Sequence, residues 1–232
     1  MNLDISEALD QLPIFPLNTV LFPGAILPLH IFEDRYKEMM KYAVDNGNLF
    51  GLSYRSSAAV GRETPPEIGS VGCVAQINAV MPLESGKMNI VSTGLVRYRV
   101  MGFRQQSPFL IARAEAFGDD PESDVEMDRA FADVEDLCRQ FLEAARTLDE
   151  GAGPQPNELP DDPESLSLLM SSVLPIENDS KQTLLESTST TFRLAKLKQL
   201  LTSALAVYNQ RIKIQGIARR NGHGKFNNKT NS

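Results

Sequence analysis

The sequence contains few of the residues from which disulfides and metal centres are built. It has two cysteines among 232 residues, Cys73 and Cys138. These two lie far apart in the chain and fit no metal-ligand spacing, so we expect both to be small apolar core residues. So few cysteines in a chain of this length indicate a reducing compartment, and we expect a cytoplasmic protein.

Histidine is equally scarce, with two in the whole chain. His30 lies three residues before Glu33, and such a pair would need a third ligand to hold a metal ion, for which the sequence offers no candidate. The favoured interpretation is a strand histidine satisfied by hydrogen bonding. His223 lies in a C-terminal segment rich in glycine and asparagine. We therefore expect no metal site and no cofactor.

The motifs of nucleotide-driven and hydrolytic enzymes are also missing. A P-loop needs the pattern Gly-x-x-x-x-Gly-Lys-Ser/Thr. The pairs Gly86-Lys87 and Gly224-Lys225 both lack the upstream glycine and the following hydroxyl residue. No Gly-x-Ser-x-Gly element is present to expose a nucleophilic serine. We expect no catalytic residues and hence a binding protein, not an enzyme.

No apolar run is suited to crossing a membrane. The most apolar stretch, residues 12–31, contains Pro13, Pro16, Pro23 and Pro28. A membrane helix does not carry four prolines in such a short span. The chain also lacks a positively charged start that leads into an apolar segment, so a secretory signal is not expected. We expect a soluble protein with no membrane partner.

Formal charge divides the chain into three parts, although the total is only −7. Residues 1–118 hold ten Lys/Arg and eleven Asp/Glu, residues 119–186 hold four and nineteen, and residues 187–232 hold nine and none. The simplest interpretation is that the basic end packs against the acidic middle. A basic end could also contact nucleic acid or another protein, and charge alone does not choose between these.

The first half has the pattern of strands. Short apolar runs broken by proline are typical of edge or barrel strands, and later stretches alternate with a period of two. We predict strands at residues 12–17, 26–32, 49–54, 71–83, 87–103 and 109–116. One amphipathic helix is predicted over 33–45, ended by Asn46-Gly47, and a hairpin turn at Glu84-Ser85-Gly86. This pattern favours a closed or partly closed antiparallel β-barrel.

Two arginines project from one face of a predicted strand. Arg97 and Arg99 alternate with Val96, Tyr98 and Val100. They could bind phosphate or carboxylate. The favoured interpretation is that they lie on the outer face of the barrel, paired with Asp or Glu.

The second half has the pattern of helices. A capping box at Ser123 and Glu126 precedes an apolar stripe of about six turns. Asp162-Pro163 predicts a short helix that ends before Pro175, a third helix is predicted from Asp179, and a last helix over 190–215. We therefore divide the chain into a β-barrel over 1–118, a helical bundle over 119–215 and a disordered basic tail over 216–232.

Several segments resemble one known family. They are LPIFPL at 12–17, FPG at 22–24, PLHIFE at 28–33, Arg35-Tyr36, VGxVAxI at 71–77 and GLxRxRV at 94–100. The likeness continues with KQxxLE at 181–186, Arg193-Leu194 and Arg211-Ile212. In this order they are similar to the N-terminal, substrate-binding domain of Lon protease, in particular to its stand-alone bacterial and plant forms. The resemblance covers about residues 12–213.

The resemblance implies a PUA-like β-barrel followed by a helical bundle with a long final helix. In Lon this helix leads into an ATPase and a Ser-Lys protease, and neither is found in these 232 residues. The implied function is non-catalytic recognition of unfolded or apolar polypeptide segments, or an adaptor role in protein quality control beside a protease or chaperone.

The candidate partner-binding residues surround the opening segment of the barrel. They are Phe22, Pro23, Leu27, Phe32 and Tyr36, and the alternative for each is a place in the core. A second hypothesis is RNA binding, by analogy with other PUA-like barrels and because of the basic end. The near-neutral barrel and the acidic middle argue against it, since both would fail to attract a phosphate backbone. The sequence predicts neither the client nor the oligomeric state.

Overall fold

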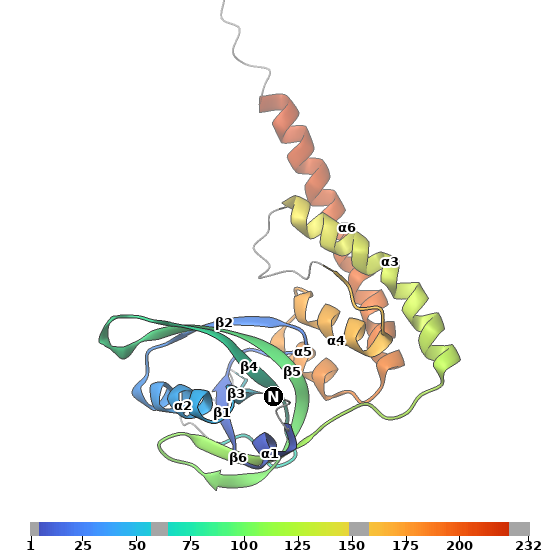
Figure 1. Cartoon of the computed structure of the whole chain (residues 1–232). Coiled ribbons are helices and arrows are strands. Elements are labelled where there is room, and N and C mark those ends of the chain that lie inside the picture. Colours follow the sequence, from blue (N-terminus) through green and yellow to red (C-terminus); the bar gives the residue numbers. More distant parts are fainter. Residues whose placement is uncertain (1–4, 57–64, 149–157, 223–232) are drawn as a thin grey trace, which may run out of the picture.

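The computed structural model describes residues 5–56, 65–148 and 158–222, with side chains up to residue 217. Figure 1 shows the strands gathered in one half of the molecule and the C-terminal helices in the other. The fold is mixed α+β, as predicted. The expected division near residue 118 falls between the last strand and the first helix of the bundle.

Five of the six strands form a closed ring. The strands are β1 (Leu12–Leu17), β2 (Ile26–Ile31), β3 (Leu49–Tyr54), β4 (Val71–Pro82), β5 (Met88–Gln105) and β6 (Leu110–Ala116). Their order is β2-β5-β4-β3-β1-β6, and β6 closes the ring by pairing with β5 as well. β2 lies outside the ring and pairs only with β5. The predicted long hairpin between β4 and β5 is confirmed, with positive φ angles at Ser85 and Gly86.

One strand pair departs from the prediction of an antiparallel barrel. β1 pairs with β3 in parallel, with Ile14 opposite Gly51. Parallel neighbours need a crossover connection, and β2 together with α2 (Asp34–Asp45) supplies it. The other pairs in the sheet are antiparallel.

Helix α2 forms where its apolar spacing predicts it. Met39, Met40 and Ala43 are its buried residues, and they pack on the sheet. The helix ends before Gly47 and Asn48, which have φ angles of 99° and 63°. Glycine and asparagine are the residues that accept this left-handed conformation most readily.

A short N-terminal helix was not predicted. α1 (Ile5–Asp10) covers the opposite face of the strands with Leu9, which is buried. An ion pair also ties the end of α1 to β5, because Arg104 of β5 donates to the carboxylate of Asp10 at 2.5 Å. Six residues are too few for an apolar period to be recognised, and the helix depends on these tertiary contacts.

The helical half follows the predicted pattern. Its helices are α3 (Asp124–Leu148), α4 (Pro163–Val173), α5 (Asn178–Glu186) and α6 (Thr190–Gly222). Asp162 caps α4 as expected, since its side chain accepts a hydrogen bond from the Ser165 amide at 2.8 Å. α6 continues past Gly216 to Gly222, beyond the predicted end, because a single interior glycine costs only about 1 kcal/mol and good helix formers follow it. Residues 223–232 of the predicted tail lie outside the described residues.

The predicted association of acidic and basic segments is confirmed where α3 packs along α6. An apolar core of α3, α4 and α6 side chains joins the helices. On the surface, Lys198 of α6 donates to the carboxylate of Asp133 of α3 at 2.8 Å. Among the described helices, none combines the length and apolarity needed to span a bilayer.

Close packing inside the ring depends on glycine at position 72. A Cβ atom there would lie 2.4 Å from the Leu52 carbonyl oxygen and 2.6 Å from the Tyr98 ring. Both neighbours are buried, and the first is backbone, so neither can move away cheaply.

We expect Gly72→Ala to lower the free energy of unfolding by about 1–3 kcal/mol, as overpacked cores do. Urea denaturation followed by circular dichroism would measure it. Gly102→Ala in β5 is the matched control, because a Cβ atom at that position meets nothing within 4 Å. Equal stability of the two variants would contradict the packing argument.

Candidate functional site

The candidate site is the solvent-exposed surface of β2 and of the β4–β5 hairpin beside it. Figure 1 shows this hairpin projecting from the ring with β2 along it. Paired residues of neighbouring strands share a face of the sheet. His30 is opposite Asn89, and Asn89 is opposite Met81, so these three side chains form one row across the three strands.

Four apolar side chains are exposed on or beside these rows. The exposed fractions are 48% for Ile26, 57% for Phe32, 47% for Met81 and 44% for Leu83. Pro28 is also exposed and lies opposite the half-buried Val91. We call this surface the outer face and define it by Ile26, Pro28, His30, Phe32, Met81, Leu83, Asn89 and Val91. Contiguous exposed apolar surface of this kind is typical of interaction sites.

His30 and Phe32 are held in place on the outer face. His30 Nδ1 forms a hydrogen bond of 2.7 Å with Asn89 Oδ1, which confirms the expectation of a hydrogen-bonded strand histidine. The rings of His30 and Phe32 stack with centroids 5.9 Å apart. Glu33, the imagined metal partner, instead accepts a hydrogen bond from Arg35 at 2.5 Å. These contacts hold the aromatic pair in one arrangement on the outer face.

The edge of β2 away from β5 is unpaired among the described strands. The Gly94 amide donates to the Ala25 carbonyl at 2.9 Å. Backbone groups alternate along an antiparallel pair, so positions 27, 29 and 31 face β5 while positions 26, 28 and 30 face outward. Proline at position 28 then removes only an outward donor, which is where an edge strand tolerates it.

Of the five predicted binding residues, the structure places Phe32 on the outer face. Phe22 is fully buried between the sheet and the helices, because the loop that carries it crosses β5 against Gly94. Leu27 is half-buried on the opposite face of β2, in the core covered by α2. Phe22 and Leu27 therefore belong to the core rather than to an exposed binding surface.

Pro23 and Tyr36 are half-buried and lie away from the outer face. Pro23 follows Phe22 in the crossing loop. Tyr36 packs on Phe15, with ring centroids 4.3 Å apart, and Arg35 lies over its ring. Burial raises the pKa of Tyr36 above its ordinary value, against the lowering effect of Arg35.

Met81 and Leu83 were missed because the sequence shows them only as the end of a strand. The signal available was that apolar residues continue to the tip of a hairpin where polar residues are usual. Which face they occupy depends on the register of β4 with β5, and that register contains two irregularities.

The cysteines are buried, as predicted. Cys73 and Cys138 are both fully buried free thiols. Burial raises the pKa of Cys138 to about 12 and raises that of Cys73 further. Both thiols are therefore protonated at neutral pH and poorly nucleophilic. Among the described residues, no three potential metal-ligating side chains of His, Cys, Asp or Glu come together.

Arg97 faces outward from the ring and is paired with an acidic residue, as the favoured interpretation predicted, but the helical half covers it. Its side chain is 1% exposed and forms an ion pair with Asp119, which follows β6. It also donates to the carbonyl oxygens of Leu185 at 3.0 Å and Ser187 at 2.6 Å. The helical half covers this face of β5, so Arg97 is not available to phosphate. Arg99, by contrast, is partly exposed and 4.0 Å from Glu115.

A second buried arginine shares the same carboxylate. Arg193 of α6 is fully buried and contacts both oxygens of Asp119, with Nη1 donating to Oδ1 at 2.8 Å. It further donates to Ser167 Oγ at 2.8 Å. We call Arg97, Asp119 and Arg193 the seam cluster, because it joins β5, the segment after β6 and α6.

The electrostatics of the seam cluster keep Asp119 ionised. Burial by itself would raise the pKa of this carboxyl group. Hydrogen bonds from Arg193 and Thr190, the charge of Arg193 and a hydrogen bond from Arg97 outweigh burial and hold the pKa below its usual value. The carboxylate is thus a structural charge that joins the sheet to the helical half.

Comparison with known proteins places this chain in a family. The model of the ATP-dependent protease La (LON) substrate-binding domain matches residues 11–203. The chain belongs to the LON substrate-binding domain family. It is 29% identical over 192 residues to the Lon protease of Anaeromyxobacter dehalogenans, a match that covers 82% of this chain and 23% of that protein. The Lon protease 2 of Myxococcus xanthus is 28% identical, with the same coverage.

The chain therefore spans about a quarter of the length of these curated relatives, which carry the name of a protease. Solved structures share the fold. A Lon N-terminal domain protein from Xanthomonas campestris has a TM-score of 0.57 at 22% identity and covers 81% of this chain and 96% of its own. The N-terminal domain of a Mycobacterium avium complex Lon protease has a TM-score of 0.61 at 20% identity, covering 83% and 98%. The resemblance inferred from the sequence is confirmed.

We expect Asp119→Asn to lower the free energy of unfolding by about 3–5 kcal/mol, because it removes the carboxylate that two buried arginines share. Among the described residues, Arg97 would keep only the exposed carboxylate of Glu164, at 3.7 Å. Denaturant titration would measure the loss. Asp133→Asn, which removes one partner of the exposed pair with Lys198, is the control and should cost far less.

The same variant should remove a pH dependence. A carboxyl group with a depressed folded pKa contributes its full stability above its unfolded pKa of about 3.9 and loses it as pH falls through the folded value. The difference between wild type and Asp119→Asn should therefore shrink below about pH 4. A difference that stays constant to lower pH would contradict the assignment.

Proposed function

We propose that this protein binds unfolded or apolar polypeptide segments without catalysis, and that it does so on the outer face and the free edge of β2. The observation that carries the proposal is that the exposed apolar side chains of the outer face lie directly beside the edge of β2 that no described strand pairs with. An extended chain could add to the edge through backbone hydrogen bonds while its alternate side chains contact Phe32, Met81 and Leu83. Sequence-tolerant binding needs this combination, because the backbone groups are common to all clients.

Family membership supports the same function. The matched domain is named for substrate binding, and the curated relatives are named as proteases. We infer that this chain retains recognition of a polypeptide and that it passes its client to a protease or chaperone as an adaptor. The inferred role needs no nucleotide, metal or nucleophile. The two thiols are buried and protonated, so they are poor nucleophiles.

The geometry does not favour the alternative of RNA binding. The strand arginine that could have gripped a phosphate, Arg97, is buried and paired with Asp119. On the outer face the exposed side chains are chiefly apolar. A phosphate backbone would gain little there, because affinity for nucleic acid depends on neutralised phosphates.

We expect Phe32→Asp and Met81→Asp to weaken binding of a chemically unfolded, fluorescently labelled polypeptide by about tenfold each, since each places a charge in an apolar contact. Fluorescence anisotropy would measure the affinity. Both side chains are about half exposed, so the unfolding midpoint should hardly change.

Val125→Asp is the matched control, because Val125 is 78% exposed on the distant helix α3. Binding should persist at low and moderate salt alike, as expected for apolar contacts. Loss of binding between about 50 and 200 mM salt would instead indicate an electrostatic ligand.

The edge itself can be tested with His30→Pro. Proline would remove the outward amide at position 30 but no hydrogen bond to β5. We expect weaker binding of the unfolded polypeptide than with His30→Val, which loses the same ring and keeps the amide. Equal binding by the two variants would show that the client does not add to β2 as a strand.

A further inference from the structure

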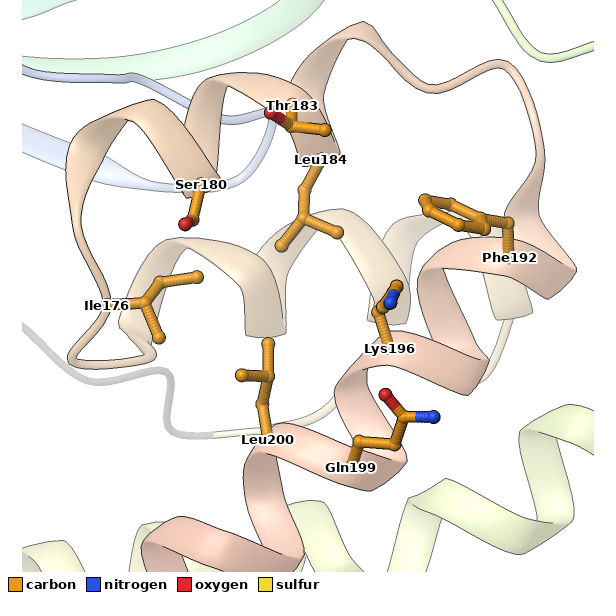
Figure 2. Close-up of a pocket in the computed structure, with 8 residues that line it drawn as sticks. All are labelled: Ile176, Ser180, Thr183, Leu184, Phe192, Lys196, Gln199 and Leu200. Carbon is orange, nitrogen blue, oxygen red and sulfur yellow. The ribbon is translucent and has the colours of Figure 1, made fainter.

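A groove lies along α6, in the helical half and apart from the outer face. α5 forms its other wall in the first section, and the segment between α4 and α5 forms it in the second. Figure 2 shows its first section, where side chains of α5 and α6 face one another across a hollow. This section has a volume of about 270 Å³ and includes Leu184, Phe192, Lys196 and Leu200 in its lining. A second section of about 420 Å³ continues along α6. The two sections share Ile176 and Leu200, so they form one continuous groove.

The α6 wall of the groove follows the period of the helix. From Phe192 to Arg211 the lining residues recur at intervals of three or four, as one face of a helix requires. Over this distance the wall is about 28 Å long at 1.5 Å per residue. The opposite face of α6 is buried against α3 and α4. The groove face lies at the border of this core: Leu200 and Ala204 are partly buried against it and Tyr208 is buried in it, whereas Phe192 and Val207 are exposed.

The lining mixes apolar side chains with neutral polar ones, and it includes cations but no carboxylate. Phe192 is 42% exposed and Val207 is 50% exposed, while Ile176 and Leu200 are half-buried between them. Lys196 and Arg211 line the groove, and neither section includes Asp or Glu. Within the described part of the chain, no carboxylate lies within ion-pair distance of Lys196, whose ammonium is 5.8 Å from the Phe192 ring centroid. The positive charge of Lys196, in the first section of the groove, therefore has no acidic partner among the described residues.

We propose that this groove binds an amphipathic, acidic helical segment of a partner protein. Apolar side chains of such a helix would fill the space over Ile176, Leu200 and Val207, and one of its carboxylates would pair with Lys196. The length of the wall matches a helix of about 18 residues. The site is distinct from the outer face, so its occupant need not be the unfolded client.

A single-stranded nucleic acid would be a poorer occupant. Such ligands need several phosphate contacts and aromatic platforms for successive bases. The groove lining has two cations, and its aromatic residues, Phe192 and Tyr208, lie more than four turns apart on α6. Tyr208 is moreover buried against Phe141 of α3.

The probe for the test is a fluorescein-labelled synthetic peptide of about 18 residues, with leucines along one helical face and glutamates beside them. Its counterpart carries lysine in place of each glutamate. Anisotropy titration of the full chain should show binding of the glutamate peptide at least about fivefold tighter than that of the lysine peptide. Lys196→Glu should abolish or reverse this preference. Val207→Asp should weaken binding of the glutamate peptide by about tenfold.

Two control variants lie on the same helix outside the groove. Lys213→Glu makes the same charge change as Lys196→Glu, and Ile217→Asp matches Val207→Asp, because both positions are exposed but neither lines the groove. Neither control should change binding of the glutamate peptide. Equal effects of Lys196→Glu and Lys213→Glu would overturn the proposal, since they would show attraction to the basic helix as a whole.

Other outcomes also decide against the proposal. These are equal affinity for the two peptides, displacement of the glutamate peptide by a short RNA, and self-association of the chain that Val207→Asp abolishes in sedimentation experiments. Unfolded-polypeptide binding should survive Val207→Asp and Lys196→Glu, because the outer face is unaltered. Failure at the groove is therefore distinguishable from failure of the proposed function.

Discussion

The carboxylate of Asp119 is the interaction on which the arrangement of the two halves depends. Arg97 reaches it from the sheet and Arg193 from the last helix, and both arginines are almost free of solvent. Burying two cations together is costly unless a shared anion and further acceptors compensate them. The Ser187 carbonyl accepts from both arginines, so the segment between α5 and α6 is held by the same contacts. Apolar side chains pack beside the cluster, but the contacts of Asp119 with both arginines form only when the sheet and α6 have one specific orientation.

The residues that join the two halves are therefore different from those of the candidate binding surfaces. The residues that hold the halves together are buried, while the two candidate binding surfaces lie on different halves and are lined by partly exposed side chains. The outer face offers, beside apolar side chains, a strand edge that no other described strand pairs with. The groove offers apolar and polar side chains with cations and no carboxylate in its lining. One protein could in this way hold an extended client and a helical partner at the same time, which is the physical requirement for an adaptor.

Most elements could be predicted because local rules govern them. The apolar spacing of Met39, Met40 and Ala43 predicted α2, and the proline after Asp162 predicted the start of α4. The candidate site was harder to predict. Phe22 and Phe32 are equally aromatic and lie ten positions apart, yet one is fully buried and the other is 57% exposed. The difference arises because Gly94 lets the loop around Phe22 pass directly over β5, a long-range contact that no local pattern encodes.

The amino-acid sequence alone determined the order of the strands and of the helices after α1, the acidic and basic segments that pair α3 with α6, and the likeness to the Lon substrate-binding domain. Each of these depends on residues near one another in the chain or on their composition. Tertiary structure alone decided that the helical half buries Arg97, that Met81 and Leu83 join Phe32, and that a groove remains along α6. These features depend on strand register and on how helices cover a sheet, and both are set by contacts between residues far apart in the sequence.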